Sequence, residues 1–338
     1  NAIKNYVGVD YCLTLNSGTS ALHATFLAYG FGSNDEVIVP SFSFISTANS
    51  VSFVGSTPVF GDIEENTFGL DPTLLPQLIS QKTKAIVPMD YGGISCKINE
   101  IKEVAQNNNL LLIEDSAEAL GASVNGKKVG SIADASIFSF CGNKVLTTGE
   151  GGAIVTNDKT IYEKIKLIRS HGRMDKVRYF ENTEQSKYLE LGYNWRMSSI
   201  TAALGISQIS KLDKIIKMRQ DNAKYISKSL SKFSEIITPS SDKGSEHIYQ
   251  MYTIRLSSKE IRDKLHDFLT EKSIFSKIYF SPIHLTDFYR NKFGMKENSL
   301  PFTEMISEQI LTLPLYPNMT SEEKIYLTES VSEFFESQ

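Results

Sequence analysis

The sequence predicts an α/β fold with a mostly parallel sheet, on two observations. Short apolar runs alternate with segments of helical periodicity through the first half of the chain, which is typical of repeated β-α-β units. A chain of 338 residues with 41% hydrophobic residues can also bury a sizeable core, enough for one large domain and a smaller one. We therefore expect a large α/β domain over residues 1–205 and a small C-terminal α+β domain over residues 206–338.

The apolar runs predict the strands of the large domain. In a parallel sheet the ligand binds beyond the carboxyl ends of the strands. Ser41, Asp115 and Lys144 all fall at or just after a predicted strand end, so we expect them to converge on one edge of the sheet. The predicted strands are Glu36–Pro40, Pro58–Asp62, Ala85–Asp90, Leu110–Asp115, Ser136–Phe140 and Ala153–Thr156.

Helical spacing of apolar residues, with charged residues on the opposite face, predicts helices at 19–29, 98–108 and 158–169. After Gly192 the pattern changes, and no internal repeat or low-complexity tract appears. The second domain is predicted to contain a long helix from about Ser198 to Leu230, an apolar run at Tyr249–Leu256, a charged helix, an apolar run at Ile274–Tyr279 and a C-terminal helix from about Ser321.

Charge and composition argue against several classes of protein. The net charge is −4 and the sequence has no basic cluster, so a nucleic-acid partner has no electrostatic support. No apolar run approaches the roughly 18 residues of a membrane span, and no signal-peptide pattern opens the chain. We therefore expect a cytoplasmic protein with no membrane partner.

The cysteines and histidines predict neither a disulfide framework nor a metal site. The three cysteines show no Cys-x-x-Cys spacing, and the five histidines show no paired ligand spacing. We therefore expect no bound metal.

One lysine stands out because of its surroundings. Lys144 follows the apolar run Ser136–Phe140 directly and precedes the glycine-rich stretch Gly149–Gly152. A lysine in such a loop is by itself most often a solvated surface charge. Upstream, however, Asp115 ends a buried-type strand, and residues 16–20 place glycine and hydroxyl side chains at the start of a predicted helix.

These three features together match what pyridoxal phosphate requires of a protein. The cofactor needs an amine for a Schiff base, an anion beside its pyridine nitrogen and a cradle for its phosphate. A helix N-terminus supplies such a cradle through its free N–H groups. The lysine, the aspartate and the helix start therefore predict a pyridoxal-phosphate site.

The chain resembles the DegT/DnrJ/EryC1/StrS family of sugar-nucleotide aminotransferases, which have the aspartate-aminotransferase fold (fold type I) of pyridoxal-phosphate enzymes. The resemblance runs nearly from end to end. Members usually carry a further segment before the position of Asn1, so any ligand contact made there lies outside this sequence. The matching motifs are Asn16–Leu22, Val37–Phe44, Thr57–Phe60, Ile113–Ala119, Phe138–Lys144, Gly149–Gly152, Gly192–Met197 and Leu313–Pro317.

The resemblance implies a role for each matching residue around the cofactor. Lys144 would bind pyridoxal phosphate covalently and carry protons during catalysis, and Asp115 would keep the pyridine nitrogen protonated. Phe44 would stack on the pyridine ring, and Glu118 would lie near its phenolic oxygen. The phosphate would be bound by Gly18, Thr19 and Ser139.

The resemblance also implies a homodimer with shared active sites. The loop Gly192–Met197 of the family reaches the neighbouring subunit, so Asn194 and Arg196 would contact the neighbour's cofactor phosphate. His284, His171 and His247 lie in segments that approach the sugar-nucleotide pocket in relatives, with His284 the first choice.

The motifs Gly142–Lys144 and Thr147–Gly152 are most similar to enzymes that aminate C4 of nucleotide-linked 4-keto-6-deoxysugars, the GDP-perosamine synthases above all. We therefore expect glutamate as the amino donor, a nucleotide-linked keto sugar as the acceptor and a role in O-antigen or other polysaccharide biosynthesis. UDP-2-acetamido-4-keto sugars and dTDP-keto sugars remain alternative acceptors, and a non-catalytic regulatory homologue remains an alternative function.

Overall fold

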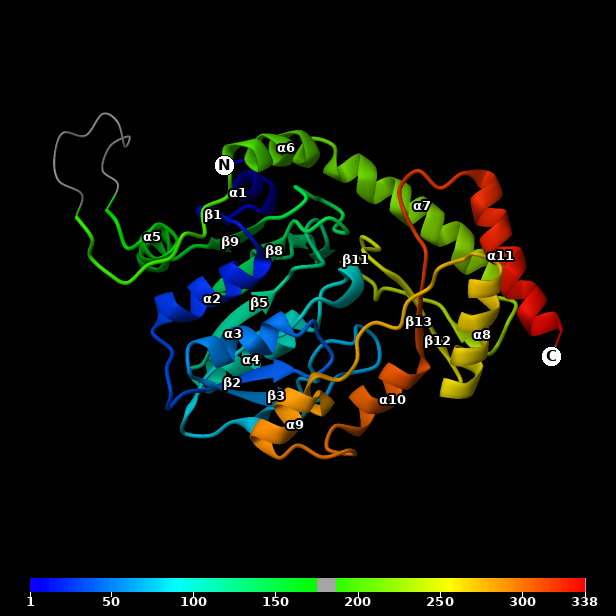
Figure 1. Cartoon of the computed structure of the whole chain (residues 1–338), viewed down its shortest axis with the longest axis horizontal. Coiled ribbons are helices and arrows are strands. Elements are labelled where there is room, and N and C mark those ends of the chain that lie inside the picture. Colours follow the sequence, from blue (N-terminus) through cyan, green and yellow to red (C-terminus); the bar gives the residue numbers. More distant parts are fainter. Residues whose placement is uncertain (175–186, 338) are drawn as a thin grey trace.

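A seven-stranded sheet forms the centre of the computed structural model, which describes residues 1–174 and 187–337 (Figure 1). Every neighbouring pair from β8 to β3 is parallel, whereas β9 runs antiparallel to both β8 and β1. The predicted mostly parallel sheet is therefore confirmed. In spatial order the strands are β1 (Tyr11–Leu15), β9 (Gly152–Thr156), β8 (Ala135–Ser139), β5 (Leu111–Asp115), β4 (Thr83–Ile86), β2 (Glu36–Pro40) and β3 (Thr57–Gly61).

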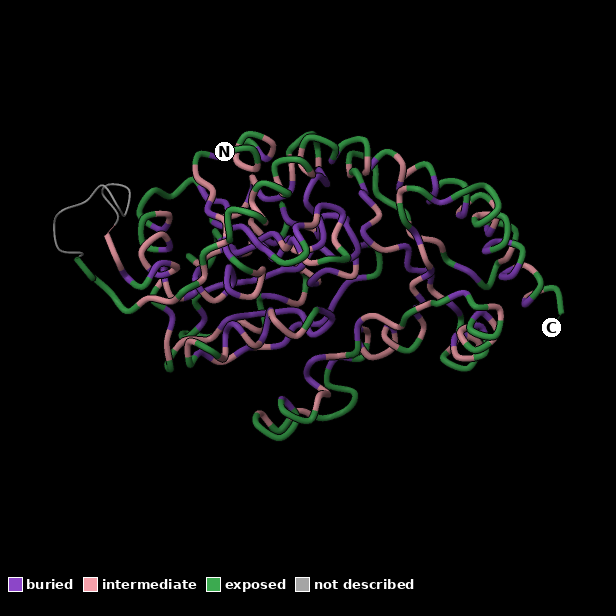
Figure 2. The backbone as a smooth tube through the Cα atoms, turned by 45° about the horizontal axis from the view of Figure 1, so that its top comes forward, coloured by how far each residue is buried: buried purple, intermediate pink, exposed green. Residues whose placement is uncertain are grey.

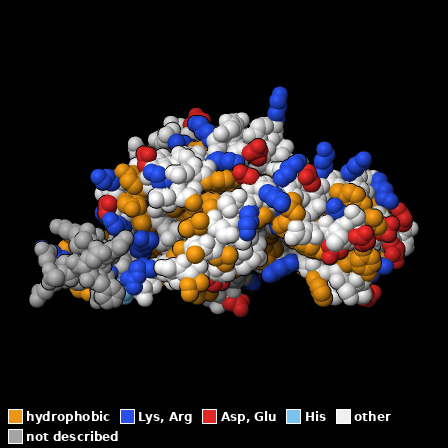
Figure 3. Space-filling model, turned by 90° about the horizontal axis from the view of Figure 1, so that it is seen from above, with side chains coloured by type: hydrophobic (Ala, Val, Ile, Leu, Met, Phe, Trp, Pro, Cys, Tyr) orange, Lys and Arg blue, Asp and Glu red, His pale blue; other side chains and the backbone are white. Residues whose placement is uncertain are grey.

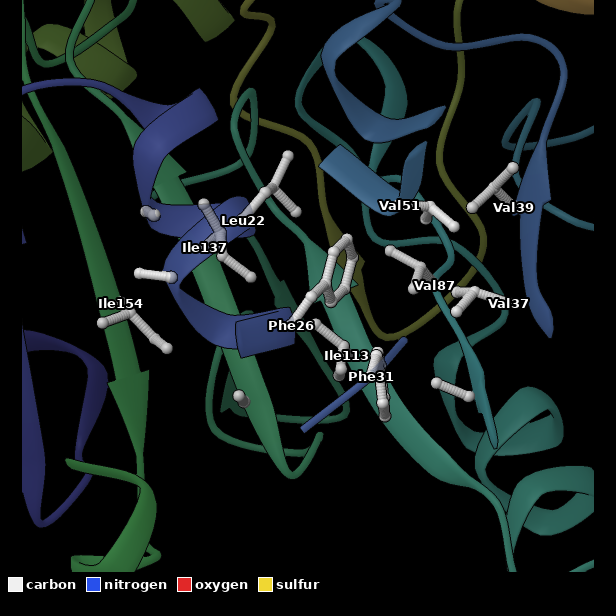
Figure 4. Close-up of a cluster of buried hydrophobic side chains, with 14 of the residues drawn as sticks. Leu22, Phe26, Phe31, Val37, Val39, Val51, Val87, Ile113, Ile137 and Ile154 are labelled. Carbon is white, nitrogen blue, oxygen red and sulfur yellow. The ribbon is translucent and has the colours of Figure 1, made fainter. Parts of the chain in front are cut away.

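Helices cover both faces of this sheet because its strands are apolar on both sides. Along β2, Val37 and Val39 belong to one hydrophobic cluster, while Ile38 between them belongs to another. Figure 4 shows the first cluster, with Phe26 at its centre. The first face carries α2 (Gly18–Tyr29), α3 (Ser46–Phe53) and α5 (Lys159–Ile168), and the second carries α4 (Ile98–Asn107).

A second hydrophobic core lies in the C-terminal part of the chain, around a three-stranded sheet in the order β10-β12-β13. In Figure 1, α6 and α7 run along the top of the large sheet toward this second core at the right. Its elements are α7 (Leu212–Leu230), β10 (Ile236–Ile237), β12 (Tyr252–Leu256), α8 (Lys259–Glu271), β13 (Ile310–Leu313) and α11 (Ser321–Glu336).

The C-terminal part also returns to the large domain. Ile283, Tyr289 and Leu300 pack into the core of the large sheet, and β11 pairs with β6. The predicted boundary at residue 206, between the large and the small domain, therefore stays a proposal. The remaining elements are α1 (Ala2–Val7), β6 (Ser123–Val124), β7 (Lys127–Lys128), α6 (Ser199–Ile209), β11 (Ser245–Glu246), α9 (Asp287–Phe293) and α10 (Pro301–Gln309), with short 3-10 turns at Leu75–Leu78, Tyr91–Gly93 and Ile283–Leu285.

The structure differs from the sequence prediction at two places in the second domain. The long helix expected over 198–230 is broken, because α6 ends at Ile209 and α7 begins at Leu212. The apolar segment Ile274–Tyr279 forms no strand and makes only a single bridge, from Lys277 to Thr312. Within the described ranges, no helix combines the length and apolarity that crossing a membrane requires.

Burial in Figure 2 is concentrated in the strands of the large sheet, so their side chains dominate the stability of the fold. Phe26→Ala should lower the free energy of unfolding by about 3–5 kcal/mol, because Phe26 is fully buried between α2 and the sheet. Phe275→Ala is the matched control, since that ring is 79% exposed, and it should change stability by less than about 0.5 kcal/mol. Equal effects of both substitutions in denaturant unfolding would contradict this assignment of the core.

Candidate active site

A cavity of about 400 Å³ opens at the carboxyl ends of β5 and β8, next to the start of α2. The parallel strands place their last residues at the same edge of the sheet, and the loop after β8 closes the cavity. Seven residues with predicted site roles line this cavity together: Gly18, Thr19, Phe44, Asp115, Glu118, Ser139 and Lys144.

Lys144 lies in a tight turn after β8, where its N–H donates to Cys141 O at 3.0 Å. Its side chain is only 12% exposed, and Nζ lies 2.9 Å from Glu118 Oε1. Burial is the largest single influence on Lys144 and lowers its pKa, but the Glu118 carboxylate, together with Tyr279 and Asp115, raises the pKa above its ordinary value. Glu118 is held in place because its Oε2 accepts the N–H of Gly92 at 3.0 Å. The amine is therefore buried, oriented and charged.

Asp115 is the last residue of β5 and lies at the bottom of the cavity, 2% exposed. The Thr47 hydroxyl donates to its Oδ2 at 2.6 Å, and the Ala117 N–H donates to its Oδ1 at 3.2 Å. Burial is the largest influence on this carboxyl group and raises its pKa, against the lowering effect of the Thr47 hydrogen bond. A positively charged group placed beside Asp115 would favour its ionised form. The site is thus suited to a cationic ring nitrogen.

The first turn of α2 meets β8 and β9 at very short range. Ser17 caps the helix by accepting the N–H of Ser20, and the N–H groups of Gly18 and Thr19 have no hydrogen-bond partner in the part of the chain that the structure describes. A Cβ on Gly18 would lie 3.1 Å from Ser139 Cβ, and one on Gly152 would lie 2.4 Å from Ser17 O. Only glycine at both positions lets the free N–H groups and the Ser139 hydroxyl share one small space. That arrangement fits a phosphate group.

Sequence analysis did not identify two further residues of the site. Thr47 is a buried donor to Asp115, and Tyr279 lines the cavity from the C-terminal part of the chain. Thr47 follows the predicted site residue Phe44 by three residues, and this short spacing could have indicated that Thr47 also belongs to the site. Tyr279 lies more than a hundred residues after Lys144, so no spacing in the sequence could pair them. Phe44 is 49% exposed although aromatic, because its ring faces the open cavity.

The structure places Asn194 and Arg196 outside the cavity of their own chain. Both are exposed, and the backbone of Arg196 bridges Leu15, next to the start of α2. The Arg196 guanidinium donates to Ser170 Oγ at 2.9 Å, and Asn194 bridges Ser170 through its backbone. The expected contact of these two residues with a neighbouring subunit's cofactor phosphate stays a prediction.

None of the three predicted histidines lines this cavity, and their expected contact with a sugar nucleotide stays a prediction. The His284 ring is completely buried between Ser41 Oγ, 2.6 Å from Nδ1, and Glu304 Oε1, 3.2 Å from Nε2. His247 is buried against the Tyr249 ring at 4.0 Å, and its Nδ1 accepts the Tyr249 N–H. His171 is exposed on the surface.

Comparisons with known proteins agree with the geometry. Residues 1–332 match the DegT/DnrJ/EryC1/StrS aminotransferase family. The GDP-perosamine synthase of Caulobacter vibrioides is 38% identical over 322 residues, which cover 94% of this chain and 84% of that protein. The UDP-4-amino-4,6-dideoxy-N-acetyl-beta-L-altrosamine transaminase of Helicobacter pylori is 34% identical over an alignment of 344 positions, which covers 99% of this chain and 88% of that protein.

Solved structures of relatives carry the same fold and the expected cofactor. The Spr1654 protein of Streptococcus pneumoniae, solved in its PLP-form, superimposes with a TM-score of 0.92 and 27% identity over 99% of this chain and 89% of that one. The amine, the carboxylate and the helix start around the cavity described above fit that cofactor. The chain belongs to the DegT/DnrJ/EryC1/StrS aminotransferase family and is a pyridoxal-phosphate-dependent aminotransferase.

Proposed function

We propose that this enzyme transfers an amino group from glutamate to C4 of a nucleotide-linked 4-keto-6-deoxysugar, as expected for a GDP-perosamine synthase. The observation that carries the proposal is the convergence of Lys144, Asp115 and the α2 N-terminus on one cavity. The 38% identity to a GDP-perosamine synthase over 94% of the chain supports this acceptor class.

Lys144 is the proposed catalytic amine. Bound pyridoxal phosphate supplies an electron sink for the negative charge that develops on the carbon atoms of the substrate. Lys144 Nζ would hold the cofactor covalently and, when released, would move protons between substrate and cofactor carbons. Glu118, 2.9 Å away, would accept a hydrogen bond from this amine and keep it oriented.

Asp115 and the start of α2 would hold the two ends of the cofactor. The Asp115 carboxylate, fixed by Thr47, would hold a proton on the ring nitrogen through a charge-assisted hydrogen bond. The N–H groups of Gly18 and Thr19, with the Ser139 hydroxyl, would bind the phosphate at the positive end of the helix. Phe44 would pack on the face of the ring.

We further propose a homodimer in which each subunit completes the other's phosphate site. Helix α6 buries none of its residues within one chain although it is mostly apolar. Ile200 is 85% exposed and Leu191, before the helix, is 83% exposed. Figure 3, which faces this side of the molecule, shows exposed hydrophobic side chains among lysines and arginines. A second copy covering this surface would bury it beside Asn194 and Arg196.

A second acceptor class has its own support. The 34% identity to a UDP-4-amino-4,6-dideoxy-N-acetyl-beta-L-altrosamine transaminase over 99% of the chain favours UDP-linked 4-keto sugars that carry a 2-acetamido group as the alternative. A direct test supplies glutamate with GDP-, UDP- and dTDP-linked 4-keto-6-deoxysugars in turn and measures 2-oxoglutarate formation. We expect ping-pong kinetics and the highest kcat/KM with the GDP sugar. Conversion of the cofactor by glutamate without turnover of any 4-keto sugar would exclude the proposed acceptor class.

The pairing of Lys144 with Glu118 generates the first prediction. Glu118→Gln should lower the pKa of Lys144, since burial then acts on the amine without the compensating carboxylate. In the cofactor-free protein, an amine-directed reagent should modify Lys144 faster at a fixed mildly alkaline pH, as measured by peptide mass spectrometry. Glu150→Gln is the matched control, because Glu150 lines the same cavity without pairing with Lys144. Identical Lys144 reactivity in the two variants would contradict the pairing.

Asp115→Asn should retain cofactor binding but reduce kcat about 100-fold, roughly 3 kcal/mol of transition-state stabilisation. An amide still accepts the Thr47 hydrogen bond but does not hold the ring nitrogen protonated. Steady-state kinetics and cofactor absorbance provide the measurement. Asp71→Asn, at a half-buried position outside the cavity, serves as the control. Turnover close to that of the unmodified enzyme would rule out the proposed role of Asp115.

The shared site predicts complementation between inactive subunits. Lys144→Ala mixed with Arg196→Ala should regain activity after subunit exchange, because one of the two sites in a hybrid dimer contains both residues. Lys144→Ala mixed with Asp115→Asn should not, since both changes then affect residues that one subunit contributes to its own site. Recovery in neither mixture, with exchange demonstrated by mass spectrometry of tagged subunits, would argue against a site shared between subunits.

A further inference from the structure

Two carboxyl groups directly behind the active site are buried completely. Asp90 follows β4, and Glu114 precedes Asp115 in β5; both are 0% exposed. One oxygen of each is satisfied: Asp90 Oδ1 accepts the Cys96 N–H at 2.9 Å, and Glu114 Oε2 accepts the Gly130 N–H at 2.9 Å and the Ser136 hydroxyl at 2.8 Å.

Within the described ranges, the other oxygen of each carboxyl group has no hydrogen-bond partner. Asp90 Oδ2, Glu114 Oε1 and the Ser116 hydroxyl are three buried polar atoms left unsatisfied in the same region. The two carboxyl groups interact with each other, and both interact with Ser116. Among the residues that the structure describes, no lysine, arginine or histidine pairs with either acid, and no cluster of three side chains could hold a metal ion here.

Two ionised carboxylates buried together without a cation beside them would be strongly destabilising. If one carboxyl group is protonated, its O–H can donate a hydrogen bond to the free oxygen of the other. Both groups then have a hydrogen-bond partner, and the pair carries a single negative charge. Burial, followed by the charge of Glu114, raises the pKa of Asp90 well above its ordinary value, and burial also raises the pKa of Glu114. The Cys96 thiol is the third titratable group facing the pair, and burial raises its pKa as well, so it stays neutral.

The pair is joined to the backbone that carries Asp115. The Asp90 N–H donates to Asp115 O at 3.1 Å, and the Asp115 N–H donates to Pro88 O at 2.9 Å. Glu114 and Ser116 are the chain neighbours of Asp115 on either side. We propose that Asp90 and Glu114 share one proton at neutral pH and that this pair positions the backbone bearing Asp115. They are positioning residues, since neither lines the cavity.

The first test is spectroscopic and uses the cofactor-loaded protein. Asp90→Asn replaces the shared proton by an amide donor, so Glu114 becomes ionised and the infrared carbonyl stretch of a protonated carboxyl group should disappear at neutral pH. Glu103→Gln on the exposed face of α4 is the control and should keep that band. Persistence of the band in Asp90→Asn would overturn the shared proton.

The second test is the pH dependence of stability. The folded protein holds a proton that the unfolded chain releases above an ordinary carboxyl pKa of about 4. Stability from this proton is therefore fully present at low pH and is lost as pH rises toward the raised folded-state pKa. The folded-to-unfolded ratio of the unmodified protein should fall relative to Asp90→Asn by about tenfold per pH unit in this window. Parallel pH profiles of the two proteins would overturn the proposal.

The positioning role has a separate readout. Asp90→Ala removes the group that donates the shared proton to Glu114, and should weaken pyridoxal phosphate binding and lower kcat, whereas Asp90→Asn keeps a donor and should retain both at neutral pH. Absorbance titration of the cofactor measures the affinity. Equal loss in Asp90→Ala and Asp90→Asn would show that the shared hydrogen bond does not position Asp115.

Discussion

Strands β5 and β8 run parallel with Asp115 opposite Ile137, and the active site depends on this pairing. The register brings the last residue of β5, the end of β8 and the lysine loop to one edge of the sheet. An antiparallel or shifted pairing would move the amine away from the carboxylate. Helix α2 closes the same edge only because Gly18 and Gly152 allow its first turn to approach Ser139 and the start of β9 at van der Waals distance.

Charge in this region is controlled by burial and by specific partners. Lys144 remains charged although buried, because Glu118 lies 2.9 Å from its Nζ. Burial raises the pKa of Asp115, against the lowering effects of the Thr47 hydrogen bond and the Lys144 charge, and a cationic ring nitrogen would lower this pKa further. Behind Asp115, the proposed shared proton between Asp90 and Glu114 reduces the buried negative charge that a cation would otherwise have to balance. Lys144 and Asp115 thus place a positive charge and a carboxyl group suited to a cation inside a single cavity.

Six of the seven strands of the large sheet and most of the cavity could be predicted from the sequence, whereas β1 and α3 were not predicted. Strand ends are visible in sequence because a buried parallel strand is a short apolar run, and seven site residues predicted from motifs line one cavity. Tyr279 and Thr47 were missed because their proximity arises from tertiary packing. The predicted long helix was wrong because its apolar periodicity continues through a break at Ser210 that local spacing does not reveal. The burial of His284 and His247 could not be predicted from the sequence, and their expected contact with the substrate stays a prediction.

The central claim is that Lys144, held beside Glu118 and across the cavity from Asp115, is the amine that binds the cofactor. Borohydride reduction of the purified protein loaded with pyridoxal phosphate, followed by peptide mapping, tests it most directly. The account predicts one cofactor adduct, on the peptide containing Lys144, and none in Lys144→Ala. A stable adduct on any other lysine, with Lys144 unmodified, would contradict it.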